Sequence, residues 1–338
     1  MKAVVVHGTR DVRVDEVPDP VPGEGEVLLA LEWGGICGSD ISYWRHGGTG
    51  TAALRHPMIL GHEIAGRVAG LGPGVPGIEV GRPVTAHPAE LVGEHAFPDG
   101  RSNLHPHVRY FGSAAFDPHT DGGFSEYRVV PAHQLRALPD GVSTRVGALA
   151  EPLGVALHAV HRAGSLRGRT VLVNGAGPIG ALVVASAKHR GASAVVAADL
   201  APASLDIARR MGADEVRDLS AQSLPEDVDV SFEASGAPAA IGPVLRATQR
   251  GGTVVQVGNL PGEAAPAALG DLVTREITWV GSYRFVDEIT DALTALRDGL
   301  DVTPLITHTF PLERAAEALA VAADRTTGSS KVMLQLSA

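Results

Sequence analysis

The chain has few of the features that define several common protein classes. Cys37 is the only cysteine among 338 residues, so no internal disulfide can form. No apolar run approaches the roughly 18 residues of a membrane-spanning helix. No basic run offsets the net charge of −10, so we expect no nucleic-acid-binding surface and no membrane partner. The first apolar run, Ala3–Val6, is too short for a signal peptide, and we expect a cytoplasmic protein.

Aromatic residues are also scarce, at 4% of the chain against 44% for all apolar residues, so the core must be mainly aliphatic. The length of 338 residues favours two domains. Residues 1 to about 150 contain short apolar runs between Pro and Gly clusters, a pattern that predicts an all-β barrel or sandwich. The clearest of these runs are Ala3–Val6, Val27–Leu31, Ile64–Val68 and Tyr127–Val130.

From residue 151, Val-rich segments of strand length alternate with Ala-rich segments of helix length. This alternation predicts a doubly wound parallel α/β sheet that binds ligands at the carboxyl ends of its strands. A last strand at Lys331–Leu336 has no evident place in that sheet. We therefore expect a catalytic domain formed by 1–150 plus 285–338 and a nucleotide-binding domain formed by 151–284. Helices are expected at Pro202–Met211, Ala239–Thr248, Asp287–Arg297 and Leu312–Ala323, and strands at Val228–Phe232, Thr253–Val257 and Ile277–Val280.

The strongest single motif lies between Val171 and Asp199. A short β-branched strand leads into Gly175, Gly177 and Gly180, which are spaced G-x-G-x-x-G, and a helical segment and a second strand follow. The glycines allow a tight turn, close approach of a pyrophosphate, and close packing of helix on strand. Asp199, 19 positions beyond Gly180, is placed to accept hydrogen bonds from a ribose. The pattern predicts nucleotide binding, against the alternative of a plain structural turn.

Three fragments contain residues that suit a metal ion. They contribute Cys37, the pair His62-Glu63, and Glu151. Each is weak alone, because a single cysteine is usually a small core residue. Together they supply a thiolate, an imidazole and a carboxylate, a set that suits zinc with one open position.

With these motifs, the chain resembles the zinc-dependent medium-chain alcohol/polyol dehydrogenase family over nearly its whole length. The resemblance extends to Asp121–Tyr127 and Phe232–Gly236. It is closest to the branch of sorbitol (L-iditol) dehydrogenase and L-idonate 5-dehydrogenase, because of Glu151, Tyr43-Trp44 and Gly281–Phe285. The family implies a GroES-like β-barrel catalytic domain and a Rossmann domain, with the C-terminal segment returning to the catalytic domain.

The resemblance also assigns the metal ligands. It implies that Cys37 and His62 bind one catalytic zinc, with Glu151 as a further ligand, directly or through water. Glu63 matches an alternate ligand, and Asp40 matches the acid that orients the zinc-bound imidazole.

A structural zinc, which many relatives hold on four cysteines, is not expected in this chain. Leu91, Glu94, Phe97 and His105 occupy the matching positions in the stretch 88–112. Leucine and phenylalanine cannot ligate zinc. We interpret the other histidines in and near this stretch as solvated side chains rather than a second metal site.

Further roles follow from the resemblance. Ser39 matches the hydroxyl that bonds the substrate oxygen and begins the proton relay, but Ser42 stands where some relatives have a histidine. Tyr43 is either a substrate-pocket residue or a core residue. Arg284 could bind hydroxyls or grip a carboxylate, unless it forms an ion pair at the domain junction. The expected cofactor-binding residues are Gly175, Gly177, Pro178, Ile179, Gly180, Asp199, Val257 and Gly258.

The sequence thus predicts oxidation of a secondary hydroxyl of a polyol or sugar acid, with hydride transfer to NAD. NAD is expected rather than NADP because the Asp199 carboxylate would repel a 2′-phosphate. The alternatives are a zinc-free quinone or carbonyl reductase of the same fold and a non-catalytic nucleotide-binding protein. A homodimer or homotetramer is expected by analogy with relatives.

Overall fold

The computed structural model describes residues 1–98 and 100–337. It divides into two compact units: unit 1 comprises Met1–Glu151 and Ile306–Ala338, and unit 2 comprises Pro152–Leu305. Residues 285–305, which the sequence assigned to the first domain, therefore belong to unit 2. The close packing of Gly154 explains this difference, because a Cβ added there would lie 3.2 Å from the backbone nitrogen of Ile289.

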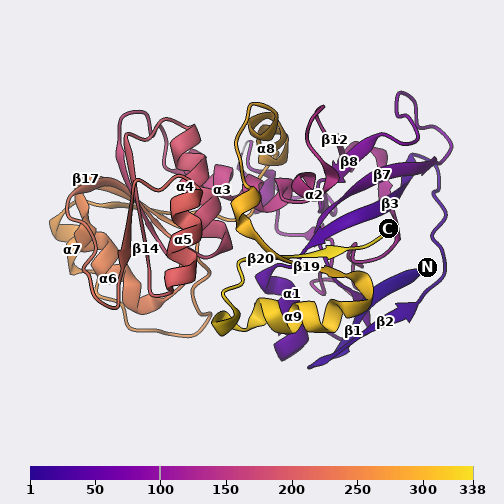
Figure 1. Ribbon diagram of the computed structural model, residues 1–338, viewed down its shortest axis with the longest axis horizontal. Coiled ribbons are helices and arrows are strands. Elements are labelled where there is room, and N and C mark those ends of the chain that lie inside the picture. Colours follow the sequence, from indigo (N-terminus) through magenta and orange to yellow (C-terminus); the bar gives the residue numbers. More distant parts are fainter. Residues whose placement is uncertain (99, 338) are drawn as a thin grey trace. The chain divides into compact units, whose positions relative to one another are not determined.

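A seven-stranded sheet forms the framework of unit 1 (Figure 1). Its long strand β3 (Glu26–Gly35) pairs antiparallel with β7 along one edge and with β11 and β20 along the other. Pairing with β20 brings the end of the chain back to unit 1. The remaining strands of the sheet are β7 (Glu63–Leu71), β8 (Pro83–Ala86), β11 (Tyr127–Pro131), β12 (Leu135–Ala137), β19 (Ile306–Pro311) and β20 (Lys331–Gln335).

Smaller sheets complete the β-structure of unit 1, and its core is mainly aliphatic, as the composition predicted. A three-stranded sheet contains β1 (Lys2–Gly8), β2 (Asp11–Glu16) and β6 (Met58–Ile59). Two hairpin-like pairs are β4 (Gly48–Thr49) with β5 (Ala52–Ala53) and β9 (Ala89–Leu91) with β10 (Val108–Tyr110).

Residues 1–150 also contain helices, so the all-β prediction for them was wrong, whereas α9 (Ala315–Ala323) of unit 1 confirms the helix predicted at Leu312–Ala323. The most important is α1 (Gly38–His46), which begins directly after Cys37 and is followed by Gly47, a left-handed C-cap with φ 68°. Its only buried residues are Asp40 and Tyr43, and one of these is charged, so the sequence shows no apolar stripe and resembled a turn. The other helices here are α2 (Thr144–Gly147) and the start of α3 (Ala150–Arg162).

Unit 2 contains the predicted doubly wound sheet of six parallel strands, in the order β15-β14-β13-β16-β17-β18. The strand order reverses between β13 and β16, and ligands bind at such switch points in folds of this type. The strands are β13 (Thr170–Asn174), β14 (Ala194–Asp199), β15 (Glu215–Asp218), β16 (Val228–Glu233), β17 (Thr248–Gln256) and β18 (Thr278–Gly281). The helices are α4 (Pro178–His189), α5 (Pro202–Arg210), α6 (Pro238–Ala247), α7 (Gly270–Thr274) and α8 (Glu288–Arg297).

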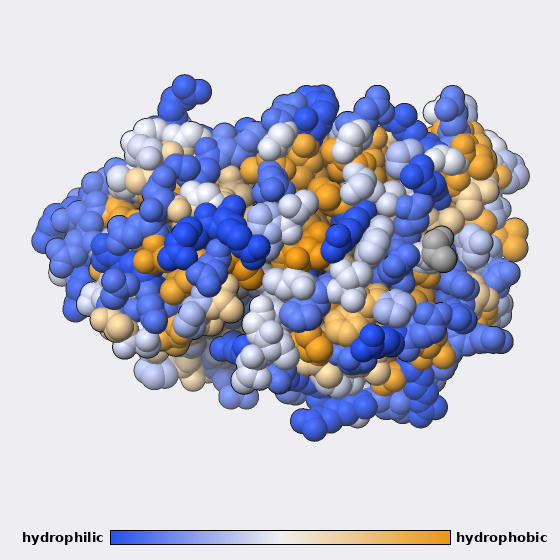
Figure 2. Space-filling model, viewed as in Figure 1, coloured by the Kyte–Doolittle hydropathy of each residue, from blue (hydrophilic) through white to orange (hydrophobic). Residues whose placement is uncertain are grey.

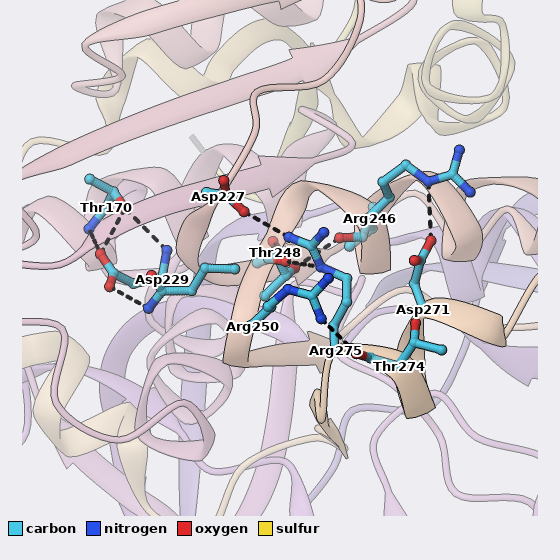
Figure 3. Close-up of polar contacts among 12 residues, drawn as sticks. Thr170, Asp227, Asp229, Arg246, Thr248, Arg250, Asp271, Thr274 and Arg275 are labelled. Carbon is cyan, nitrogen blue, oxygen red and sulfur yellow. Dashed lines mark hydrogen bonds and ion pairs between the residues drawn. The ribbon is translucent and has the colours of Figure 1, made fainter.

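Polar contacts tie together the amino-terminal edge of this sheet (Figure 3). Arg275 donates to the Asp227 carboxylate at 2.7 Å and to the carbonyl of Thr248, the first residue of β17, at 3.1 Å. Asp229 near the start of β16 accepts from both the amide and the hydroxyl of Thr170 on β13. These contacts hold the strand starts in register and leave the carboxyl edge for ligand-binding residues.

The three motif glycines have different surroundings at that carboxyl edge. Gly175 has φ 92°, the left-handed conformation that glycine adopts without strain. A Cβ on Gly180 would lie only 1.8 Å from the Gly175 carbonyl oxygen, whereas a Cβ on Gly177 would meet nothing within 4 Å. Pro178 follows Gly177 as the first residue of α4, a position that suits its fixed φ. Gly177 therefore has space around it, and Gly180 holds the helix close to the strand.

The visible face of the molecule is mainly hydrophilic (Figure 2). On the face shown in Figure 2, hydrophilic side chains surround smaller apolar patches. No helix in the described part of the chain has both the length and the apolar character needed to cross a bilayer.

Gly177 and Gly180 provide a matched test of the motif's packing. Gly180→Ala should lower the urea midpoint of unfolding, at a cost of roughly 1–3 kcal/mol, because the added methyl group meets backbone atoms. Gly177→Ala should cost about 1 kcal/mol or less, since its Cβ would project into open space. Urea denaturation of both variants checks this prediction. Equal losses of stability would contradict the packing role assigned to Gly180.

Candidate active site

The end of strand β3 and the start of helix α1 position Cys37. Asp40, on the first turn of α1, is fully buried and accepts a hydrogen bond from the Cys37 amide at 2.9 Å. Its other carboxylate oxygen accepts from the Gly61 amide at 3.1 Å. One carboxylate therefore fixes the segment of Cys37 and the segment before His62. The family resemblance predicted that Asp40 orients the zinc-bound imidazole. Among the described residues, however, the hydrogen bonds of Asp40 go to these two backbone amides.

The Asp121-Gly-Gly turn positions His62 from the other side. The amides of Gly123 and Phe124 donate to the carbonyls of Gly61 and Leu60 at 2.9 and 2.8 Å. A Cβ on Gly122 would lie 2.2 Å from the Leu60 carbonyl oxygen, so this close approach requires glycine. His62 is thus held between the 121–124 turn and the buried Asp40.

Cys37, His62 and Glu63 form a group that could hold a metal ion. One ligand atom from each residue lies within 4.8 Å of the others. His62 is 6% exposed and Glu63 is 1% exposed. Sulfur, imidazole nitrogen and carboxylate oxygen are the ligand types that zinc accepts. In residues 1–98 and 100–337 this is the one group of three or more such side chains at metal-binding distance.

Lys331 contacts the same group from the C-terminal strand β20. Its ammonium lies 2.6 and 2.7 Å from the two carboxylate oxygens of Glu63 and donates to the Ile36 carbonyl at 3.1 Å. The two side chains of this ion pair are only 3% and 1% exposed. Lys331 therefore links the residue before Cys37 to the residue after His62.

Negative groups predominate around the imidazole. Burial alone would lower the pKa of His62, but Cys37, Asp40 and Glu151 raise that pKa well above its usual range. Burial raises the pKa of Glu63 to about 7, although the Lys331 ammonium opposes the shift. Four acidic side chains (Cys37, Asp40, Glu63 and Glu151) thus share one permanent cation, so a divalent cation would balance their charge. The residues present fit a zinc ion.

Glu151 stands outside the group formed by Cys37, His62 and Glu63. It is 5% exposed, at the second residue of α3, and its Oε1 accepts a hydrogen bond from the Tyr110 hydroxyl at 2.6 Å. The Tyr110 ring also meets the His62 ring edge-on, with centroids 5.7 Å apart. Tyr110 therefore links the two candidate ligands, a role that the sequence did not indicate.

Ser39 and Tyr43 both lie on α1 but differ in burial. Ser39 is partly exposed in the first turn. Tyr43 is 1% exposed in the core of unit 1, and its hydroxyl accepts a hydrogen bond from the Ala114 amide at 2.9 Å. Its surroundings favour the core-packing interpretation over substrate contact. Ser42, at the position where some relatives have a histidine, donates to the Gly48 carbonyl.

The 88–112 stretch brings three histidine rings together. The His95 ring lies 4.5 Å from that of His107 and 5.3 Å from that of His105, measured between centroids. Phe97 packs edge-on against His105. Phe97 and His105, which stand at positions where relatives have zinc-binding cysteines, thus take part in packing between rings.

In unit 2, Asp199 holds the glycine turn as well as being placed for a ribose. One oxygen of its carboxylate accepts from the amide of Ala176, inside the motif, at 2.7 Å. The other accepts from the Ala201 amide at 2.9 Å. A carboxylate offers about four lone-pair sites, so acceptor capacity remains for ribose hydroxyls.

Val257 and Gly258 follow strand β17 at the same sheet edge, close to Glu233. Both of their amides donate to the Glu233 carbonyl at 2.8 Å. A Cβ on Gly258 would lie 2.3 Å from the Gly236 nitrogen. The buried Glu233 carboxylate accepts hydrogen bonds from Ser235 and Gln256, and also from Gly236. The sequence singled out this segment only by resemblance.

Arg284 lies in unit 2, in the segment between β18 and α8. Its φ is 51°, a left-handed conformation that is uncommon for a residue other than glycine. The guanidinium carbon lies 4.9 Å from the centroid of the Tyr283 ring.

Two family models and several known proteins match this chain. Residues 23–140 match the alcohol dehydrogenase GroES-like domain, and residues 178–298 match the zinc-binding dehydrogenase domain. L-idonate 5-dehydrogenase (NAD(P)(+)) of Escherichia coli is 36% identical over 98% of both chains. Sorbitol dehydrogenase of Bos taurus is 38% identical over 94% of this chain and 91% of its own.

A solved structure gives the same result. The crystal structure of the Escherichia coli L-idonate 5-dehydrogenase superposes with a TM-score of 0.93 over 99% of this chain and 97% of its own, at 36% identity. The chain belongs to the zinc-dependent medium-chain polyol dehydrogenases. It is an oxidoreductase that acts on a small molecule with zinc and a nicotinamide cofactor.

Lys331 provides a test of the buried charge balance. In metal-stripped protein, Lys331→Met should lower the free energy of unfolding by roughly 3–5 kcal/mol, because Glu63 would remain buried without its partner. The double variant Glu63→Gln, Lys331→Met should recover most of that loss. Urea denaturation measures both.

An exposed lysine provides the matched control. Lys2 forms a similarly short ion pair with Glu313, but their side chains are 45% and 56% exposed. Lys2→Met should change stability little, because solvent screens exposed pairs. A double variant at 63 and 331 as unstable as Lys331→Met alone would refute the charge argument.

Proposed function

We propose that the enzyme uses one zinc ion and NAD to oxidise a secondary hydroxyl of a polyol or sugar acid. The observation that carries the proposal is the group of the half-buried Cys37 with the buried His62 and Glu63, whose ligand atoms lie within 4.8 Å of one another. The names of the E. coli and bovine relatives, an idonate and a sorbitol dehydrogenase, support this substrate class.

Cys37 and His62 would hold the zinc, with Glu151 as third protein ligand and Glu63 as alternate ligand. When bound, zinc supplies Lewis acidity that favours loss of a proton from an alcohol. Tyr110 would orient the Glu151 carboxylate through its hydrogen bond. Asp40 would fix the two backbone segments that carry Cys37 and His62.

Ser39 would accept a hydrogen bond from the substrate hydroxyl and pass its proton toward solvent. Its position in the first turn of α1, two residues after Cys37, supports this role. Some relatives have a histidine where this chain has Ser42, and the Ser42 hydroxyl donates to the Gly48 carbonyl. The proposed relay therefore does not include a histidine at this position.

The glycine turn would hold the cofactor at the carboxyl edge of the unit 2 sheet. NAD supplies the hydride acceptor. The α4 N-terminus at Gly177, Pro178 and Ile179 would face the pyrophosphate, and the backbone of Val257 and Gly258 would meet the nicotinamide amide. Asp199 would bind the ribose hydroxyls.

Arg284 would bind the substrate carboxylate when the substrate is a sugar acid. A guanidinium binds a carboxylate through two parallel charge-assisted hydrogen bonds, whereas the hydroxyls of a neutral polyol are uncharged acceptors and are bound more weakly. The name of the idonate dehydrogenase relative supports this assignment.

Subunit assembly is a separate part of the proposal. β18 lies at the end of the unit 2 sheet order, so its outer edge could pair with a second copy in a homodimer or homotetramer. Size-exclusion chromatography with light scattering tests this association.

Metal content separates the proposal from the zinc-free reductase alternative. Protein stripped of adventitious ions and then reconstituted should hold about one zinc per chain, and Cys37→Ser should lose both metal and dehydrogenase activity. Elemental analysis and initial rates measure the two effects. Unchanged turnover of Cys37→Ser with a carbonyl or activated alkene would favour the reductase. Zinc-free protein without any turnover, but with bound nucleotide, would favour a non-catalytic protein.

A panel of polyols and aldonates tests the substrate class. Initial rates should be highest with a polyol or aldonate, and Arg284→Met should raise the KM for aldonates while leaving that for neutral polyols nearly unchanged. Arg284→Lys, which keeps the charge but loses the two-point grip, is the matched control. Its KM for aldonates should lie between those of the wild type and of Arg284→Met. Equal effects on both substrate types would remove the carboxylate grip from the proposal.

Asp199 tests the preference for NAD. Asp199→Ala should raise the KM for NAD roughly tenfold, because a ribose partner is lost. It should also lower the ratio of kcat/KM with NAD to kcat/KM with NADP, because the repulsion of a 2′-phosphate is removed. Initial rates with the two cofactors give the ratio. Because Asp199 also binds the Ala176 amide, circular dichroism should check that the variant is still folded. An unchanged ratio of kcat/KM for NAD to kcat/KM for NADP would rule out the role of Asp199 in choosing the cofactor.

A further inference from the structure

Two histidines on helix α3 share one buried carboxylate at the start of helix α8. His158 and His161 are three residues apart, so they lie on neighbouring positions of one helix face. The Nδ1 atom of His158 lies 2.8 Å from Oε1 of Glu288, and that of His161 lies 3.2 Å from the same oxygen. His158 is 4% exposed and Glu288 is 8% exposed. The site proposed above uses none of these three side chains.

The direction of the His161 hydrogen bond follows from Arg190. The Arg190 guanidinium lies 3.0 Å from Nε2 of His161. A guanidinium can only donate, so Nε2 accepts and Nδ1 carries the proton that is donated to Glu288. Burial opposes ionisation of Glu288, but hydrogen bonds from the two histidines hold its pKa well below its usual range. Glu288 of α8 is therefore an anion that two histidines hold against α3.

The second oxygen of Glu288 holds the chain segment that precedes α8. It accepts a hydrogen bond from the Val286 amide at 2.7 Å. At the other end of the segment, Arg162 of α3 donates to the Gly281 carbonyl at 3.2 Å. The 281–286 segment is thus attached to α3 at both ends, and Arg284, with its left-handed φ of 51°, lies between these attachments.

We infer that His158 and His161 act through Glu288 as positioning residues for Arg284, and so favour substrates that carry a carboxylate. This inference rests on the proposed role of Arg284. A left-handed arginine persists only where its surroundings fix the backbone, and the two attachments to α3 provide that constraint. Holding its backbone in place lowers the entropy that a long side chain loses when it grips a carboxylate through two bonds.

A double-mutant cycle tests the inference. Glu288→Ala should raise the KM for an aldonate roughly tenfold, the usual effect of losing hydrogen bonds to a charged group. The kcat for that substrate and the KM for a neutral polyol should stay within about twofold, because the chemical step and the uncharged contacts are untouched. In an Arg284→Met background, Glu288→Ala should add no further loss, since it acts through Arg284.

Histidine variants keep the test decisive if Glu288→Ala does not fold. His158→Ala removes the donor to Glu288 and should repeat the selective rise in aldonate KM. His158→Asn keeps a donor near the position of Nδ1 and should restore most of the wild-type KM.

Three results would overturn the inference. They are an additive loss in the Arg284→Met background, an equal rise in KM for neutral polyols, and failure of His158→Asn to improve on His158→Ala. Failure of the proposed function looks different. In that case Arg284→Met alone would leave the aldonate KM unchanged, and both the carboxylate grip and this inference would fall together.

Discussion

The ion pair between Lys331 and Glu63 is the interaction on which the arrangement of unit 1 depends. It joins β20 to the residue after His62, and its third bond reaches the residue before Cys37. A charged pair removed from water is costly unless its geometry is good and its other hydrogen-bonding groups are satisfied. Here the lysine contacts both carboxylate oxygens and a carbonyl. The acidic side chains around the imidazole can gather because this cation is fixed among them.

The other contacts of the site follow the same principle of fixing ligands from outside. Asp40 holds backbone amides, the 121–124 turn holds the Leu60-Gly61 backbone, and Tyr110 holds the Glu151 carboxylate. Each contact removes freedom from a segment that carries a candidate ligand. Such outer contacts determine whether a metal-binding geometry exists before the ion arrives. In unit 2, Asp199 acts similarly on the glycine turn.

The motifs that the sequence revealed are those whose chemistry depends on residue type and local spacing. Gly175 and Gly180 were predictable because a left-handed φ and a 1.8 Å approach both require glycine. Cys37 and His62 were recognised because few residue types bind zinc. Lys331 was not predicted, because its partner is 268 positions away and a lysine at a strand start normally faces solvent. Helix α1 was missed because only two of its residues are buried and one of them, Asp40, is charged, so no apolar stripe marks it. Residues 285–305 were misassigned because the packing of Gly154 leaves no local signal.

The order of elements along the chain has a consequence for biosynthesis. β20 lies between β3 and β19 in the sheet of unit 1, yet all of unit 2 separates it from β3 in the sequence. During translation the N-terminal part of unit 1 therefore emerges long before its sheet can close. Until β20 arrives, Glu63 has no lysine beside it and the edge of β3 that will pair with β20 is open. Unit 2 is continuous and can fold earlier. A chain interrupted after unit 2 would therefore contain the whole nucleotide-binding sheet and every candidate metal ligand, but not the strand that carries Lys331.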